Sequence, residues 1–367
     1  MKLALIRRQF AATGGAELYL QRLLGALAQR GHEVHLFAES WSESNQGVIF
    51  HPVVAGGSRA IRPVRFAEAV RGEIAKEQFD CVFSLDRTLK QDVYRAGDGV
   101  HRVWLERRKQ FAPWWKKPFV GVGAFHRNMM ALEAQTFDPA NTRHVIVNSE
   151  IVRREILQHF QFPMERIHLV RNGVDVARFQ NGKRAETRAR FGVKEDEFLL
   201  LFVGSGWERK GLSFLLTLME DLRQKTLAQT KTVKLLVVGK GKKPSGTPPD
   251  VIFAGPMSDV ENALAAADVF TFLPIYEPSS NAVVEALAAG RPVVTSSQNG
   301  ASELIREGIN GSVVSNPADR AAVFSAASCW LDIKRQRPIA PTADISIERN
   351  VAETLTVLEM AAKERRA

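Results

Sequence analysis

The stretch VFTFLPIYEPSSNAVVEALAAGRPVVTSS, residues 269–297, contains a complete strand–helix–strand pattern. The apolar run at its start predicts a strand, NAVVEALAAG predicts a helix ended by Gly290, and PVVTSS predicts a second strand. Consecutive strands joined by a helix are typical of a parallel sheet covered by helices. Two glutamates eight residues apart, Glu277 and Glu285, lie in the loop before this helix and about one turn inside it.

The same alternation recurs along the whole chain. Strand-like runs are KLALI, EVHLF, CVFSL and HVIVNS in the first half, and FLLLFVGS, KLLVVGK and VIFAG in the second. Between the first two runs, Leu20, Leu23, Leu24 and Leu27 form one apolar helical stripe before Gly31. The pattern predicts an α/β protein with parallel sheets.

Two domains are expected, because 367 residues exceed what one hydrophobic core usually supports. The alternation pauses in the polar, turn-rich residues 172–197, which places the boundary near Arg171. We therefore predict doubly wound domains at 1–170 and 171–347, facing each other across a ligand-binding cleft. The last helical pattern, about 348–367, is followed by no strand and is expected to pack back on the first domain.

Composition favours a cytoplasmic protein. The two cysteines, Cys81 and Cys329, are far apart, so no disulfide framework is indicated. Neither a signal peptide nor an apolar run long enough to span a bilayer is visible. The net charge is +10, and 24 lysines and arginines against 17 acids in residues 1–170 supply most of it. A basic surface suits nucleic acid, anionic lipid or a phosphorylated substrate, and charge alone does not choose among them.

Two loops have the residue types that bind phosphate. In RRQFAATGGAELYL, Gly14 and Gly15 stand between a strand and a helix, where backbone amides can approach an anion. In FVGSGWERKGLSFLL, Arg209 and Lys210 follow a strand and suit a diphosphate. The alternatives are a tight turn that needs glycine and a solvated charged surface.

The opening stretch combines a phosphate site with two carboxylates. Amides at a helix N-terminus bind anions, whereas Glu277 and Glu285 would repel a bare phosphate. A ligand with hydroxyls at both ends of a diphosphate, such as a nucleotide sugar, satisfies both groups. The amides expected to face the phosphate are those of Ser279, Ser280, Asn281 and Ala282.

These motifs together resemble a known family. The E-x7-E pattern with EALAAGRPVV, preceded by ADVFTFLP, FVGSGWERKG and NGVD (Asn172–Asp175), resembles the retaining GT-B glycosyltransferases of family 4. TGGAE, RGHEVHLFAESW and DVYRAGDGVHRVWLE look most like the lipopolysaccharide core glucosyltransferases, which add glucose to heptose. The resemblance covers nearly the whole chain. It implies UDP-glucose as donor, lipid A-core as acceptor, and two Rossmann-like domains.

The resemblance also implies residue roles. Glu285 would hold the donor ribose, Glu277 the hydroxyls of the transferred sugar, and Arg209 with Lys210 the diphosphate. Further donor contacts would come from Gly14, Gly15, Arg171 and the backbone of Met257.

Three further features of this chain concern the side chain that faces the sugar, the residue at position 280, and metal binding. Many relatives have a histidine facing the sugar; Asp98 in RAGDGVHR matches the aspartate of the lipopolysaccharide subgroup, with His101 as a rival. Ser280 stands where most relatives have glycine. No D-x-D motif or histidine–acid metal cluster is visible, so we expect no metal or other cofactor.

A basic aromatic stretch, residues 101–130, has seven lysines or arginines, one acid and six aromatic residues. Rings and cations interleaved in this way suit an anionic membrane surface. Burial of the rings in the core and a single-stranded nucleic-acid groove are the alternatives, and nucleic acid is not expected. The residues expected at the inner membrane surface are Trp104, Arg107, Arg108, Lys109, Trp114, Trp115, Lys116 and Lys117.

Three functions therefore follow from the sequence. The first is a membrane-associated, cytoplasmic hexosyltransferase acting on the lipopolysaccharide core. The second is a family member with another donor, such as GDP-mannose or UDP-GlcNAc, or another lipid-linked or polysaccharide acceptor. The third is a non-enzymatic nucleotide- or RNA-binding protein with the same fold.

Overall fold

The computed structural model describes residues 1–9, 15–41, 47–226, 232–331, 338–341 and 343–366. Contacts divide the chain into two compact units. The first contains Met1–Arg171 with Ile347–Ala367, and the second contains Asn172–Ser346. Arg171 and Ile347 thus belong to the first unit, one residue away from the expected boundaries on each side.

The first unit is built on a seven-stranded sheet with the order β3-β2-β1-β4-β5-β6-β7. All neighbouring strands of this sheet pair in parallel. Its strands are β1 (Lys2–Ile6), β2 (Glu33–Ala38), β3 (Val48–Pro52), β4 (Cys81–Ser84), β5 (Gln91–Arg95), β6 (Thr142–Val147) and β7 (Ile167–Leu169). Its helices are α1 (Gly15–Gln29), α2 (Arg62–Ile74), α3 (His101–Phe111), α4 (Ala124–Thr136), α5 (Glu150–Phe160) and α13 (Ile347–Arg366), with short 3-10 turns at Lys117–Phe119 and Met164–Arg166.

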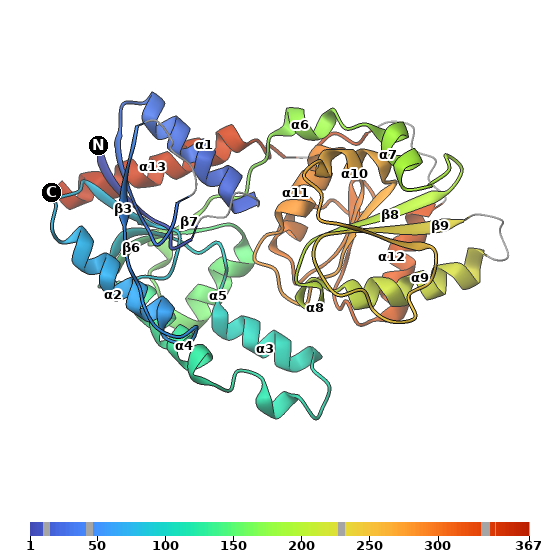
Figure 1. Ribbon diagram of the computed structural model, residues 1–367, viewed down its shortest axis with the longest axis horizontal. Helices are drawn as coiled ribbons and strands as arrows, with labels where there is room; N and C mark the ends of the chain where they lie inside the picture. Colours follow the sequence, from blue (N-terminus) through green and yellow to red (C-terminus); the bar gives the residue numbers. More distant parts are fainter. Residues whose placement is uncertain (10–14, 42–46, 227–231, 332–337, 342, 367) are drawn as a thin grey trace. The chain divides into compact units, whose positions relative to one another are not determined.

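The leucine stripe of α1 faces the core, as its spacing predicts. Leu20, Leu23, Leu24 and Leu27 are at most 1% exposed and belong to one buried cluster with residues of β1, β2 and α13. Helix α13 runs beside α1 and contacts β4, β5 and β6 (Figure 1). The expectation that the C-terminal helix returns to the first domain is confirmed.

The second unit is built on a six-stranded parallel sheet with the order β10-β9-β8-β11-β12-β13. The strands are β8 (Phe198–Val203), β9 (Val233–Val238), β10 (Val251–Gly255), β11 (Val269–Phe272), β12 (Val293–Ser296) and β13 (Gly311–Val314). The helices are α6 (Val176–Gln180), α7 (Arg184–Arg190), α8 (Trp207–Lys210), α9 (Leu212–Thr226), α10 (Val260–Ala266), α11 (Asn281–Ala288) and α12 (Arg320–Leu331), with a 3-10 turn at Gly300–Leu304.

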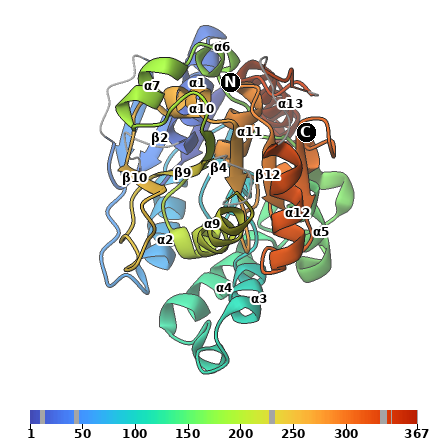
Figure 2. The same ribbon diagram turned by 90° about the vertical axis from the view of Figure 1, so that its right-hand side faces the viewer.

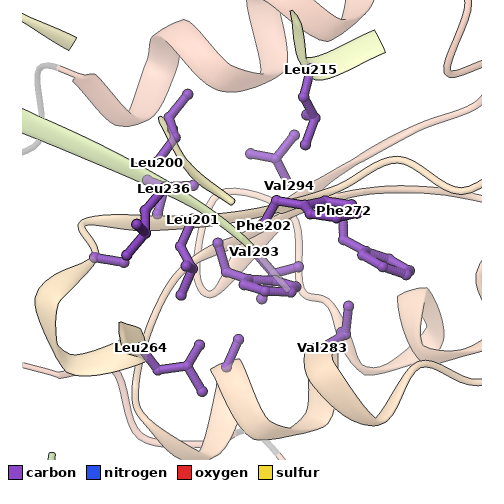
Figure 3. Packing of buried hydrophobic residues seen from close by; sticks show 14 of the residues in the cluster. Leu200, Leu201, Phe202, Leu215, Leu236, Leu264, Phe272, Val283, Val293 and Val294 are labelled. Carbon is purple, nitrogen blue, oxygen red and sulfur yellow. The ribbon is translucent and has the colours of Figure 1, made fainter. Parts of the chain in front are cut away.

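Apolar side chains on both faces of this sheet form the core of the second unit. Phe202 and Phe272, from the neighbouring strands β8 and β11, are both fully buried. Leu215 of α9 approaches from one side of the sheet, and Leu264 of α10 and Val283 of α11 approach from the other (Figure 3). Helix α12 lies beside α9 (Figure 2). Burial on both faces explains why these strands read as continuous apolar runs.

Candidate donor site

The order of strands in the second sheet reverses between β8 and β11. These strands pair in parallel, with Val269 opposite Leu200 and Phe270 opposite Leu201. Ligands of open α/β sheets bind outside the carboxyl ends of the strands at such a reversal. The loop after β8 leads to Arg209 and Lys210, and the loop after β11 leads to Glu277. The sequence motifs therefore meet at one edge of one sheet.

Two glycines let these loops approach each other closely. Gly211, at φ +76°, ends α8, and a Cβ there would lie 1.7 Å from the carbonyl oxygen of Leu273. Gly204, at φ +157°, leaves space for the side chain of Lys210, whose Cδ would lie 2.6 Å from an added Cβ. Larger residues would separate α8 from the end of β11, so the glycines place the cations beside the Glu277 loop.

Arg209 connects the two loops. Its Nη1 lies 2.9 Å from Oε2 of Glu277 and donates a hydrogen bond to the carbonyl of Tyr276 at 3.3 Å. The amide of Ile275 donates to the carbonyl of Arg209 at 3.0 Å. Oε2 of Glu277 is buried and has no aligned hydrogen bond among the described residues, so the contact with Arg209 is an ion pair only. The Glu277 side chain as a whole is 14% exposed, which leaves part of it accessible to a hydroxyl of a bound sugar.

Lys210 is the second cation of the site. Burial lowers the pKa of its ammonium group, Glu277 and Glu285 oppose this shift, and Arg209 adds to it. Its Nζ lies 5.7 Å from the ring centroid of Phe272. Because Lys210 interacts with both glutamates, the two carboxylates share one electrostatic environment, as the nucleotide-sugar hypothesis requires.

Glu285 lies on α11 and is partly buried. Burial raises the pKa of its carboxyl group to about 7, although the nearby cations Arg178 and Lys210 act to lower it. A carboxyl group with such a pKa takes up or releases a proton near neutral pH. A ligand that donates hydrogen bonds to the carboxylate would favour its charged form and lower this pKa.

The N-terminus of α11 is held from two sides. Ser280 is the N-cap, and its hydroxyl accepts from the amide of Val283 at 3.4 Å. Asn172 donates its Nδ2 to the carbonyl of Ser279 at 3.0 Å and to Oδ1 of Asn281 at 2.7 Å. Asn172, the first residue of the NGVD motif, thus stabilises the turn that is expected to bind phosphate.

One expectation at this turn is corrected. The amide of Ser280 was expected to face a phosphate, but it donates to Oδ1 of Asn299 at 3.1 Å. Asn299 is fully buried and also bonds the hydroxyl of Thr295. Asn281 and Ala282 at the same turn are only partly buried. Asn299 was missed because nothing in its neighbourhood in sequence marks it as a partner of this turn.

The remaining expected donor residues lie as follows. Met257 follows β10 and is partly buried against the core of the second unit. Arg178, which the sequence did not single out, bonds the carbonyl of Ser258 and the carboxylate of Glu261. The carbonyl of Arg171 accepts from α13 in the first unit. Gly15 is the first residue of α1, and Gly14 lies outside the described residues.

The structure distinguishes Asp98 from His101 in the first unit. Asp98 is exposed in the loop between β5 and α3. His101 bonds Nδ1 of His126 on α4 at 3.0 Å. Burial, with Arg87 and His126, lowers the pKa of His101 to about 4, so its ring is neutral. Asp98 is thus the more available of the two side chains.

The basic aromatic stretch forms α3, the short turn at Lys117–Phe119 and α4. Three of its six rings are exposed, whereas burial was the alternative that the sequence raised: Trp114 is 79%, Trp115 is 56% and Phe119 is 74% exposed. Lys109, Lys116 and Lys117 are exposed, whereas Trp104, Arg107 and Arg108 are partly buried. We call residues 114–122 the tryptophan segment.

One group of histidine and acid side chains in the described part of the chain is compact enough to hold a metal ion, although no such cluster is visible in the sequence. The ligand atoms of His35, His51 and Glu77 lie within 4.8 Å of one another. Nδ1 of His35 and Nε2 of His51 are 2.7 Å apart, and Glu77 pairs with Lys2 at 2.9 Å. Each of these groups already has a protein partner, and all of them lie in the first unit. The group was missed because its members come from different elements.

Comparison with known proteins identifies the family. The family described as "Glycosyltransferase Family 4" matches residues 13–178, and the one described as "Glycosyl transferases group 1" matches residues 197–332. The chain is a glycosyltransferase of the family 4 type. The non-enzymatic alternative that the sequence left open is therefore set aside.

Individual relatives agree with this assignment. Lipopolysaccharide glucosyltransferase WaaG of Escherichia coli K12 is 26% identical over 323 residues, which are 83% of this chain and 82% of WaaG. The crystal structure of WaaG has a TM-score of 0.75 at 22% identity and covers 98% of this chain and 95% of its own. Anabaena HepE in complex with UDP-glucose has a TM-score of 0.71 at 18% identity, covering 98% and 100%. This family 4 glycosyltransferase thus has the GT-B fold of two Rossmann-like units.

Proposed function

We propose that this family 4 glycosyltransferase transfers glucose from UDP-glucose to a heptose of the lipopolysaccharide inner core. The observation that carries the proposal is the meeting of Arg209 and Lys210 with Glu277 and Glu285 at the strand reversal of the second sheet. The named activity of WaaG and the UDP-glucose bound to HepE support this choice of sugar and acceptor.

Each of these side chains matches one part of a nucleotide sugar. Arg209 and Lys210 neutralise the diphosphate, helped by the backbone at the N-terminus of α11. Glu277 accepts hydrogen bonds from the hydroxyls of the transferred sugar. Glu285 accepts them from the ribose, and the backbone near Met257 contacts the base.

Departure of UDP is the step that these cations assist. The bond between the anomeric carbon and the diphosphate oxygen breaks, and negative charge develops on the leaving phosphate. Arg209 and Lys210 stabilise that charge without rearranging, because both are already fixed beside Glu277. The acceptor hydroxyl attacks the same face of the sugar, and its proton passes to the leaving diphosphate. Asp98, a residue of the first unit, is the side chain that we assign to the transferred sugar, as the family resemblance implies.

No metal step is included in this mechanism, because protein cations supply the charge that a divalent ion would provide. We expect transfer to continue at an unchanged rate in the presence of EDTA. A loss of activity that Mg²⁺ or Mn²⁺ restores would contradict this part of the proposal.

The choice of donor is tested by thermal unfolding in the presence of UDP-glucose, GDP-mannose, UDP-GlcNAc and ADP-glucose. A ligand that binds only the native state raises the melting temperature. We expect the largest rise with UDP-glucose and a smaller one with UDP-GlcNAc. Stabilisation by GDP-mannose alone would mean that GDP-mannose, and not UDP-glucose, is the donor. Transfer of radiolabelled glucose to lipid A-core that ends in heptose then tests the acceptor, with core lacking heptose as the negative control.

We also propose that the tryptophan segment holds the enzyme at the inner face of the cell membrane, where a lipid-anchored acceptor is found. No helix in the described part of the chain combines the length and apolarity needed to cross a bilayer. Exposed Trp114, Trp115 and Phe119 beside Lys116 and Lys117 suit the headgroup region of anionic lipid. Each cation near such a surface contributes about 1 kcal/mol.

Co-sedimentation with vesicles of phosphatidylglycerol and phosphatidylethanolamine tests this surface. We expect binding at low salt, weaker binding at 0.5 M NaCl, and loss of binding when Trp114 and Trp115 are both changed to serine. Val54→Ser is the matched control, because Val54 is an apolar residue that is 89% exposed on another part of the first unit. Equal binding by all variants, or none by the wild type, would reject the membrane proposal.

A further inference from the structure

Two buried charges of opposite sign lie beneath the Asp98 loop. Arg87, in the connection between β4 and β5, has a side chain only 9% exposed, and Glu133 of α4 is 1% exposed. Nη2 of Arg87 lies 2.9 Å from Oε1 of Glu133 and donates to the carbonyl of Gly99 at 2.8 Å. The guanidinium therefore bonds the loop residue next to Asp98 and the carboxylate at the same time.

Glu133 in turn holds the beginning of α3. Its Oε1 accepts from the amide of His101 at 2.7 Å, and its Oε2 accepts from the amide of Arg102 at 3.3 Å. The N-cap residue of α3 is Val100, which has no side-chain hydrogen bond to offer. The carboxylate from α4 thus replaces the missing cap, and its charge suits the positive end of the helix.

The loop between β5 and α3 depends on this support. It turns through Gly99, which is at φ +68°. Its backbone makes short-range bonds from Gly97 to Arg95 and from Gly99 to Ala96, and the amide of Ala96 donates to the carbonyl of Ile146 on β6 at 2.8 Å. Other longer-range bonds come from Arg87 and from Asn148, whose Nδ2 donates to the carbonyl of Gly97 at 3.3 Å. A loop with two glycines around an exposed aspartate would otherwise sample many conformations.

Electrostatics agrees with these contacts. Burial opposes the charge of Arg87, yet Tyr94, Glu133 and Asp98 raise the pKa of its guanidinium above the usual range. Burial also raises the pKa of Tyr94, so its phenol stays neutral. The charged groups that face Arg87 are therefore Glu133 below the loop and Asp98 on it.

We propose that Arg87 and Glu133 are positioning residues for Asp98: the pair fixes the 96–100 loop and the start of α3, and so sets where the Asp98 carboxylate stands. This inference rests on the proposed function, in which Asp98 contacts the transferred sugar. Neither Arg87 nor Glu133 itself touches substrate. Their removal should change the rate of transfer more than the binding of the donor nucleotide, since the diphosphate and ribose contacts lie in the second unit.

The test uses the full-length enzyme with Glu133→Gln, which keeps the side-chain volume but removes the charge. We expect kcat for glucose transfer to fall about 10- to 100-fold, in the range of losses from mispositioned catalytic groups, while KM for UDP-glucose changes less than about twofold. Glu133→Asp, which keeps the charge, should recover part of the rate. Glu106→Gln, an exposed acid on α3, is the matched control and should transfer glucose like the wild type.

A double variant separates positioning from general destabilisation. If Glu133 acts through Asp98, Glu133→Gln should lower kcat by less than about threefold in an Asp98→Asn background, since residues that act as a unit are not additive. Multiplicative losses, or an Asp98→Asn variant as active as the wild type, would overturn the inference. So would an unchanged kcat in Glu133→Gln. If that variant fails to fold, Arg87→Lys gives the same comparison, because it keeps the charge but shortens the reach to Gly99.

These experiments distinguish a failure of the proposed transferase activity from a failure of the positioning role. A wild-type enzyme that transfers no sugar from any nucleotide donor to heptose-terminated core would contradict the proposed function, whatever the variants do. An active wild type with an unaffected Glu133→Gln variant would overturn only the positioning role. The rise in melting temperature with UDP, measured on every variant, shows that the nucleotide site of the second unit is intact.

Discussion

The guanidinium of Arg209 and the carboxylate of Glu277 lie 2.9 Å apart, joining the loop after β8 to the loop after β11. The pair combines a cation for the diphosphate with an acceptor for sugar hydroxyls, two functions that a nucleotide sugar requires side by side. Removing one partner leaves the other charge partly buried and uncompensated.

Arg209→Ala should therefore lower kcat for glucose transfer about 100- to 1,000-fold, because one stabilising donor is lost from the departing diphosphate. Arg209→Lys should recover only part of the rate, since an ammonium group lacks the planar, two-bond geometry of guanidinium. Steady-state kinetics with UDP-glucose measure both. Arg223→Ala removes another paired arginine of the same unit, on α9, and should leave kcat unchanged. Equal effects of the two alanine variants would contradict a role in the donor site.

Glu285→Gln should change how stability depends on pH. Burial raises the pKa of Glu285 from 4.5 to about 7, so the folded protein binds this proton more tightly than the unfolded chain does. The resulting stabilisation is fully present below pH 4.5 and is lost as the pH rises to about 7. The free energy of unfolding of the glutamine variant, relative to that of the wild type, should therefore be higher at pH 8 than at pH 5 by on the order of 1–3 kcal/mol.

Urea unfolding at the two pH values, followed by circular dichroism, measures this difference in the free energy of unfolding. Glu106→Gln serves as the control, because its carboxylate is exposed. The same difference between wild type and Glu285→Gln at both pH values would argue against a raised pKa.

Gly211→Ala should be far more damaging than Gly206→Ala. Both glycines have a left-handed backbone conformation, at φ +76° and +75°, which destabilises an alanine by about 1–2 kcal/mol. A Cβ at Gly206 meets nothing within 4 Å, but one at Gly211 would overlap the carbonyl of Leu273. We expect Gly211→Ala to lower the free energy of unfolding by several kcal/mol more than Gly206→Ala does, because α8 must move. For the same reason, UDP should no longer raise the melting temperature of Gly211→Ala. Thermal unfolding with and without UDP compares the two, and similar melting temperatures would refute the close approach.

Ser280→Ala should destabilise the protein by about 1 kcal/mol, because the N-cap hydroxyl of α11 no longer accepts from Val283. Ser280→Gly should cost only a few tenths of a kcal/mol. Affinity for UDP-glucose should be retained in both variants, since the backbone of Asn281 and Ala282 is unchanged. Urea unfolding and calorimetric titration give the two quantities. A large loss of affinity in Ser280→Gly would mean that the hydroxyl itself contacts the donor.

Five of the six strands of the second sheet were predicted, because each reads as an apolar run; β13, whose sequence GSVV is short and begins with glycine and serine, was missed. Strand β5 was missed, since Gln91, Asp92 and Arg95 make QDVYR look polar, although all five residues are buried. Its polar groups have distant partners: Gln91 bonds Thr142, and Asp92 bonds Arg365 of α13. Such partners are invisible in sequence because they lie tens to hundreds of residues away.

What the sequence alone determined is the alternation of strands and helices, the glycines and cations after β8, and the two glutamates around α11. These are local patterns, set by hydrophobic period, turn chemistry and spacing along the chain. Only the tertiary structure decided that Arg209 pairs with Glu277, that Asn172 and Asn299 hold the start of α11, and that Glu133 caps α3 beneath Asp98. Each of these contacts joins separate elements, and packing of the two sheets and their helices, rather than any nearby residue, brings the atoms within hydrogen-bonding distance.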